Sequence, residues 1–174
     1  MKKNYFKYIV LFVAALIVRL LPFRAPNLEP IMSMQMPLAK MYGGLSAFVF
    51  GFMSIAVYDS FTAGLGVWTW ISAVAYGLVG LGARTYLKNR SSNWKNYAIY
   101  AIIGTISFDA LTGLTLGPIF FGQAFIMALL GQIPFTAIHL LGNVSFAIVL
   151  SPVIAKWIER SESVSVAVPE TVRV

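Results

Sequence analysis

The side chains of this 174-residue chain that could do chemistry are few: one histidine, six carboxylates and no cysteine. Without cysteine there is no disulfide, thiolate metal site or cysteine nucleophile. One histidine and six scattered acids do not predict a metal centre with several ligands. The spacings of a serine–histidine–aspartate triad, a zinc HExxH motif and a Walker A phosphate loop are missing. The sequence therefore predicts no enzyme, metal or cofactor, and any ATP hydrolysis must come from another subunit.

Three of the carboxylates predict a polar site inside apolar surroundings. Glu29, Asp59 and Asp109 lie at or near the ends of apolar segments. A carboxylate at such a place needs a partner or a water-filled cavity. A structural ion pair of Asp109 with Arg19 or Arg24 is one explanation. The other is a polar cavity that contacts a ligand.

Four further side chains extend this candidate site. His139 and Asn143 are four residues apart and therefore share one face of a helix. A hydrogen bond between helices and a ligand contact explain the histidine equally well. Trp68 and Trp70 suit either an aromatic belt at a membrane interface or a stacking surface for a flat heterocycle.

The composition indicates which elements must position these residues. Hydrophobic residues make up 59% of the chain and charged residues 11%, whereas a soluble domain has about 25% charged residues. Uncharged runs cover 41–58, 60–83 and 110–155. A membrane-spanning helix needs about 20 such residues. We therefore expect an all-α, polytopic membrane protein.

Proline, glycine and polar turns divide the apolar runs into six helical segments. These are 6–21, 31–41, 43–60, 67–87, 95–112 and 134–157. The piece 119–131 is short, so we expect an interfacial or re-entrant segment there, with a seventh crossing as the alternative. Residues 1–160 form one transmembrane helical domain, and 161–174 form a flexible cytoplasmic tail.

The basic residues predict topology, because they fall between the apolar runs and not on one face of a nucleic-acid-binding module. With six segments and both termini cytoplasmic, Arg19 and Arg24 lie outside. The other eleven lie inside: Lys2, Lys3, Lys7, Lys40, Arg84, Lys88, Arg90, Lys95, Lys156, Arg160 and Arg173. A seventh crossing would weaken this bias. The expected location is the cell membrane, crossed several times.

The layout resembles the substrate-binding S component of energy-coupling-factor (ECF) vitamin transporters. The stretches that carry the resemblance are 26–30 (PNLEP), 59–70 (DSFTAGLGVWTW) and 133–143 (IPFTAIHLLGN). The resemblance implies a six-helix bundle that binds a vitamin or related micronutrient from outside the cell. It also implies a transmembrane coupling subunit and two ATPase subunits as partners.

Carried onto this sequence, the resemblance implies a gate over 22–30 and a cavity lined by Asn27, Glu29, Asp59, Trp68, Trp70, Asp109, His139 and Asn143. One feature departs from the family pattern, because the first helix lacks the Ala-x-x-x-Ala face that docks the coupling subunit. The small residues Gly43, Ala47 and Gly51 could replace it, although packing inside the bundle is the favoured explanation for them and for the pair Ala73 and Gly77. The alternative functions are a stand-alone secondary transporter or channel, and a small membrane protein without a ligand.

Overall fold

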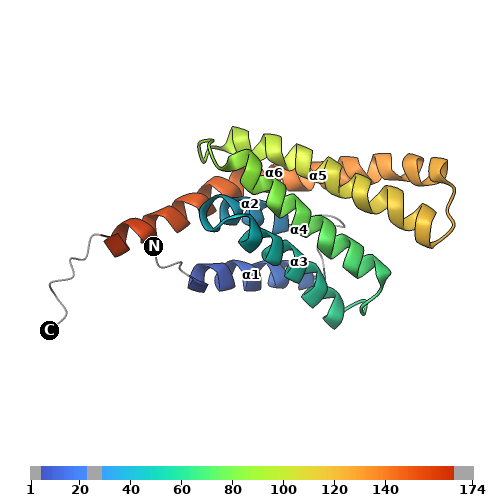
Figure 1. The fold of residues 1–174 in the computed structure, drawn as a ribbon, viewed down its shortest axis with the longest axis horizontal. Helices are drawn as coiled ribbons and strands as arrows, with labels where there is room; N and C mark the ends of the chain where they lie inside the picture. The colour runs from blue at the N-terminus through green and yellow to red at the C-terminus, as the bar shows by residue number, and fades with distance from the viewer. Residues whose placement is uncertain (1–4, 23–28, 167–174) are drawn as a thin grey trace.

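The computed structural model describes residues 5–22 and 29–166, and in this part of the chain it contains helices and no strands (Figure 1). The six α-helices and one π-helical turn are α1 (Tyr5–Leu20), α2 (Ile31–Tyr42), α3 (Gly44–Phe61), α4 (Val67–Leu87), α5 (Trp94–Thr115), η1 (Leu116–Phe120) and α6 (Phe125–Val166). The predicted all-helical fold is therefore confirmed.

Three helices are long and apolar enough to cross a membrane: Gly44–Phe61, Trp94–Phe120 and Phe125–Arg160. They place the protein among membrane proteins by length and composition. The other described helices do not meet the same measure of length and hydropathy.

The short helix α2 is the centre of the bundle. Ten of its twelve residues are buried, and it contacts every other α-helix. A helix of this length rises only about 18 Å. Its first residue therefore lies among the middle turns of its longer neighbours, and Glu29, just before it, is held at that depth.

Helices α3 and α4 pack closely because small residues face each other. A methyl group at Gly80 would stand 2.7 Å from the carbonyl carbon of Ala47. Gln35 from α2 reaches into this contact and donates from Nε2 to the carbonyls of Ala47 (2.8 Å) and Tyr76 (2.9 Å). Gln35 is 1% exposed, so one buried amide joins three helices.

The suggestion that Gly43, Ala47 and Gly51 form an external docking face is wrong. Ala47 is fully buried, and the space over Gly51 is taken by Gln35 and the Tyr76 carbonyl. Gly43 forms the turn between α2 and α3 at φ +98°, a conformation that favours glycine. On α4, Ala73 and Gly77 are also buried. These small residues serve packing inside the bundle.

The last apolar run differs from its prediction. Helix α6 is continuous from Phe125 to Val166 and contains Pro134 and Pro152, so the expected break before residue 134 is wrong. The piece 119–131 is neither a separate re-entrant segment nor a further crossing, because its second half forms the first turns of α6. Proline is tolerated inside helices of membrane proteins where neighbouring groups satisfy the freed carbonyl. The helix also continues beyond 160, into the predicted tail.

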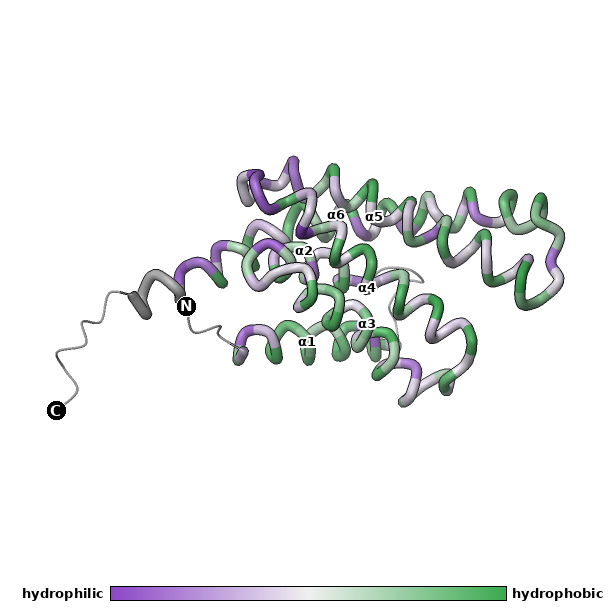
Figure 2. Tube along the Cα trace, viewed as in Figure 1, coloured by the Kyte–Doolittle hydropathy of each residue, from purple (hydrophilic) through white to green (hydrophobic). Residues whose placement is uncertain are grey.

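Basic residues gather at one end of the molecule, where Figure 2 shows the hydrophilic ends of the helices. Lys7 of α1 donates to the carbonyl of Trp157 in α6. Lys40 at the end of α2 donates to the Arg90 carbonyl (2.6 Å), between α4 and α5. Arg84 of α4 donates to the Lys40 carbonyl (2.6 Å). The α3–α4 and α5–α6 connections lie toward the opposite end (Figure 1).

Candidate ligand-binding cleft

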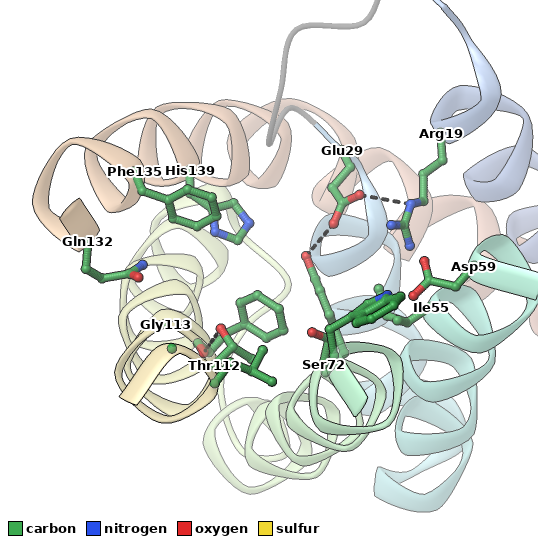
Figure 3. Close-up of a pocket in the computed structure, with 15 residues that line it drawn as sticks. Arg19, Glu29, Ile55, Asp59, Ser72, Thr112, Gly113, Gln132, Phe135 and His139 are labelled. Atoms are coloured by element: carbon green, nitrogen blue, oxygen red, sulfur yellow. Dashed lines mark hydrogen bonds and ion pairs between the residues drawn. The ribbon is translucent and has the colours of Figure 1, made fainter. Parts of the chain in front are cut away.

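An open cleft of about 460 Å³ separates the α3–α4 hairpin from the α5–α6 hairpin (Figure 3). Its inner wall is formed by Arg19 of α1 and by Glu29, which lies two residues before α2. Trp68, Phe108 and Phe135 supply aromatic surface. Polar groups from several helices thus meet apolar walls in one hollow.

An ion pair forms the wall of the cleft at the start of α2. Arg19 Nε lies 3.0 Å from Glu29 Oε2, and the Tyr76 hydroxyl donates to Glu29 Oε1 at 2.8 Å. The Arg19 guanidinium also donates to the Ser54 carbonyl (3.1 Å) and stacks over the ring of Tyr58. A buried carboxylate needs such partners, and a position beside the N-terminus of α2 favours it further.

Asp59 lies on the α3 side of the cleft and is 8% exposed. Its Oδ2 accepts a hydrogen bond from the Thr69 hydroxyl at 2.7 Å, and its backbone carbonyl accepts from Gly64. Thr69 in turn accepts from the Gly66 N–H at the start of α4. Asp59 therefore closes the α3–α4 turn and also presents a carboxylate to the cleft.

Asp109 and His139 form a buried pair between α5 and α6. His139 Nδ1 lies 2.7 Å from Asp109 Oδ1, and the two residues are 3% and 1% exposed. The alternative explanation, an ion pair of Asp109 with Arg19, is wrong, because Arg19 pairs with Glu29; Arg24 lies outside the described residues. His139 lines the cleft, whereas Asp109 lies behind it.

The His139 ring is held between two aromatic rings. Phe108 and Phe135 contact it edge to face, with ring centroids 5.7 and 5.8 Å away. These contacts and the carboxylate of Asp109 fix the orientation of the imidazole. An Nδ1–H directed at Asp109 leaves Nε2 as the acceptor of the neutral ring.

Asn143 does share a face with His139, but it does not line the cleft. It is fully buried, and its Nδ2 donates to the Thr105 hydroxyl at 2.9 Å. Thr105 in turn contacts the sulfur of Met32 in α2. Asn143 and Thr105 together therefore connect α6, α5 and α2 outside the cleft.

The two predicted tryptophans are not a pair. Trp68 lines the cleft, whereas Trp70 lies on another face of α4, near the ring of Phe52 on α3. Residues two apart on a helix are about 200° apart around its axis, so both cannot stack on one ligand. Asn27 and most of the predicted gate lie outside the described residues.

Several cleft residues were missed by the sequence reasoning: Ser72, Tyr76, Phe108, Thr112, Gln132 and Phe135. A signal for some of them was present. Trp68, Ser72 and Tyr76 follow one another at intervals of four, so they share the face of α4 that carries Trp68. Phe135 precedes His139 by four residues in the same way.

Comparisons with protein-family models, with curated proteins and with solved structures found no match for this chain. A function must therefore be argued from the cleft and from the sequence pattern.

Proposed function

We propose that this chain is the membrane-embedded binding subunit of an ECF-type importer and captures a vitamin or related micronutrient from outside the cell. The observation that carries this proposal is the cleft between the two hairpins. Ligand pockets commonly enclose about 300–1,000 Å³, with apolar walls and a few convergent polar groups. The cleft has a volume of about 460 Å³ and draws polar groups from α1, α3, α4, α5 and α6.

The chemistry of the cleft suits a flat molecule with polar substituents. Trp68 and Phe135 offer aromatic surface for stacking. Asp59 and His139 offer hydrogen-bonding groups on opposite sides. Both are held in place, by Thr69 and by Asp109, so a ligand meets a largely preformed site.

The proposal includes six crossings of the cell membrane with both termini in the cytoplasm. The gathering of basic side chains at one end supports this orientation, since cytoplasmic loops carry an excess of lysine and arginine. The cleft then opens at the outer half of the bundle. Transport needs the transmembrane coupling subunit and the two ATPase subunits that the resemblance implies.

Helix α1 offers the surface for the coupling subunit. It packs on the bundle through Leu11 and Ala15 and exposes Phe6, Ile9 and Ile17. With Val13, which is also exposed, these residues follow one another at intervals of three, four and four residues and form a continuous apolar face. It replaces the external stripe of small residues that α3 does not provide.

The test is to purify the chain alone in mild detergent and identify released small molecules by mass spectrometry. We expect one compound in near-stoichiometric amount from the wild type. Ser72→Trp fills the cleft and should abolish co-purification. Val49→Trp adds the same side chain on an exposed face of α3 and should retain the compound. Equal retention by both variants contradicts the proposed cleft.

A second measurement separates a binding subunit from a stand-alone transporter. Proteoliposomes that contain only this chain should bind the identified compound but should not accumulate it. Uptake driven by an ion gradient, without any partner, would reject the ECF-type assignment in favour of secondary transport.

A further inference from the structure

A long furrow runs between α4 and α5, on the other side of these helices from the cleft. Two adjoining hollows of about 650 and 320 Å³ form it, and both include Leu78 and Leu111. The cleft is lined by Trp68, Ser72 and Tyr76 of α4. The furrow is lined by residues two positions further along, such as Trp70, Val74 and Leu78, which point to a different side of the helix.

The furrow forms because two glycines, which have no side chain to fill it, lie along its floor. Gly82 of α4 and Gly104 of α5 line it, and the Tyr100 hydroxyl lies so close to Gly82 that a side chain there would collide with it. Leu78 and Ile103 form the rims and are 46% exposed each. The walls are apolar over most of their length.

The furrow is nearly as long as the hydrocarbon core of a bilayer is thick. From Trp70 to Tyr86, the first and last furrow residues on α4, the helix rises about 24 Å, close to the roughly 30 Å of a hydrocarbon core. An indole stands at one end, and Tyr86 and Tyr100 stand at the other, with ring centroids 5.5 Å apart. Tryptophan and tyrosine are enriched at the two membrane interfaces.

The tyrosine end carries a cation. The Arg90 guanidinium lines the furrow and lies over the ring of Tyr86 at 4.2 Å. Among the described residues it has no hydrogen-bonding or ion-pair partner. Lys88 precedes it, Lys95 follows in the first turn of α5, and the stretch 88–95 contains no acid; Glu159 approaches the α4–α5 loop at Ser92.

From this combination we propose that the inner part of the furrow is a binding site for one anionic phospholipid. The headgroup phosphate lies on Arg90, and an acyl chain lies along Tyr86, Gly82, Ile103 and Leu78. A soluble phosphate would use the arginine but has no need of the apolar walls. A zwitterionic phospholipid also carries a phosphate, but its positively charged headgroup nitrogen would lie beside the cations Arg90 and Lys88, whereas an anionic phospholipid brings no such cation. The inference rests on the proposed crossing of the membrane by α4 and is independent of the ligand in the cleft.

The test uses the absence of cysteine from the sequence, so that Ile103→Cys gives a single position for a fluorescent label in the furrow. The labelled chain is placed in phosphatidylcholine nanodiscs that contain a minor fraction of either brominated phosphatidylglycerol or brominated phosphatidylcholine. We expect much stronger quenching by the brominated phosphatidylglycerol. Arg90→Gln should lower the affinity of the furrow for phosphatidylglycerol about fivefold, which corresponds to the roughly 1 kcal/mol that one arginine contributes near an anionic surface.

Lys95→Gln is the matched control, because Lys95 lies in the same loop region but does not line the furrow. It should leave the preference for the anionic lipid intact. Equal effects of Arg90→Gln and Lys95→Gln, or equal quenching by both lipids in the wild type, would overturn the headgroup site. An absence of quenching by either lipid would show that the furrow does not face the bilayer.

A blocking variant tests the acyl-chain path separately. Ser107 is exposed on the α5 side of the furrow, and Ser107→Trp should fill it and remove quenching by both lipids. If this variant does not fold, the comparison of Arg90→Gln with Lys95→Gln still decides the proposal.

Discussion

Each buried carboxylate in this bundle has a partner that the fold brings to it. Glu29 has Arg19 and the Tyr76 hydroxyl, and Asp109 has His139. A charge without a partner is costly in an apolar interior. The polar groups of the cleft can therefore persist inside a membrane protein without a bound ligand.

The two tryptophans of α4 provide a matched pair of variants at the residue scale. Trp68→Ala should weaken binding of the co-purifying compound by about 2 kcal/mol, as truncation of an aromatic anchor commonly does; that is roughly thirtyfold in Kd. Trp70→Ala should leave the Kd nearly unchanged, because Trp70 does not line the cleft. Titration of the purified variants by calorimetry measures both constants. Similar losses in the two variants would mean that the indoles act through fold stability and not through contact.

At the scale of the elements, the contact between α3 and α4 depends on glycines, which have no side chain to hold the helices apart. Gly51 and Gly80 leave the space that the Gln35 amide occupies. The amide then satisfies two helix carbonyls at once. The close approach of α3 and α4 and the central position of α2 therefore depend on each other.

Gly80→Ala tests this arrangement. The added methyl group would collide with the Ala47 backbone and the Gln35 amide, so we expect a loss of about 1–3 kcal/mol in the free energy of unfolding. Thermal unfolding in detergent, followed by circular dichroism, measures the change. Gly131→Ala is the control, because nothing lies within 4 Å of its added methyl group. That substitution should be neutral or stabilising by up to about 1 kcal/mol; equal melting temperatures for the two variants would refute the packing argument.

At the scale of the whole molecule, most of the basic side chains and the cleft lie toward opposite ends. Lysine and arginine side chains join α1 to α6 and α2 to the α4–α5 loop, whereas the paired carboxylates lie nearer the hairpin connections. Helix α6 has 42 residues and rises about 63 Å, more than a bilayer core requires. In the proposed orientation, its C-terminal part extends beyond the hydrocarbon at the basic end.

Reporter fusions test this orientation. A reporter after residue 90 and one at the C-terminus should both be active in the cytoplasm, and one between α5 and α6 should be active outside. The reason is the excess of basic residues at one end of the bundle. A C-terminus outside the cell would require an odd number of crossings and would reverse the proposed exposure of the cleft.

The sequence by itself determined the helical, membrane-type fold and most helix positions, because apolar composition and turn residues act locally. It also indicated Glu29, Asp59, Trp68 and His139 as candidates for one polar site, since a polar group in an apolar segment needs a partner or a cavity, and all four line the cleft. It did not identify their partners. The pairing of Glu29 with Arg19 depends on how far the short helix α2 extends into the bundle. The pairing of Asp109 with His139 depends on which faces of α5 and α6 contact each other.

Only the tertiary structure decided the remaining features. Helix α6 continues through Pro134 because its neighbours and its surroundings tolerate one missing hydrogen bond. The rotation of α4 decides that Trp68 and not Trp70 faces the cleft, and Asn143 is kept from the cleft by the depth at which it meets Thr105. These outcomes depend on contacts between residues far apart in the chain, and no local pattern contains them.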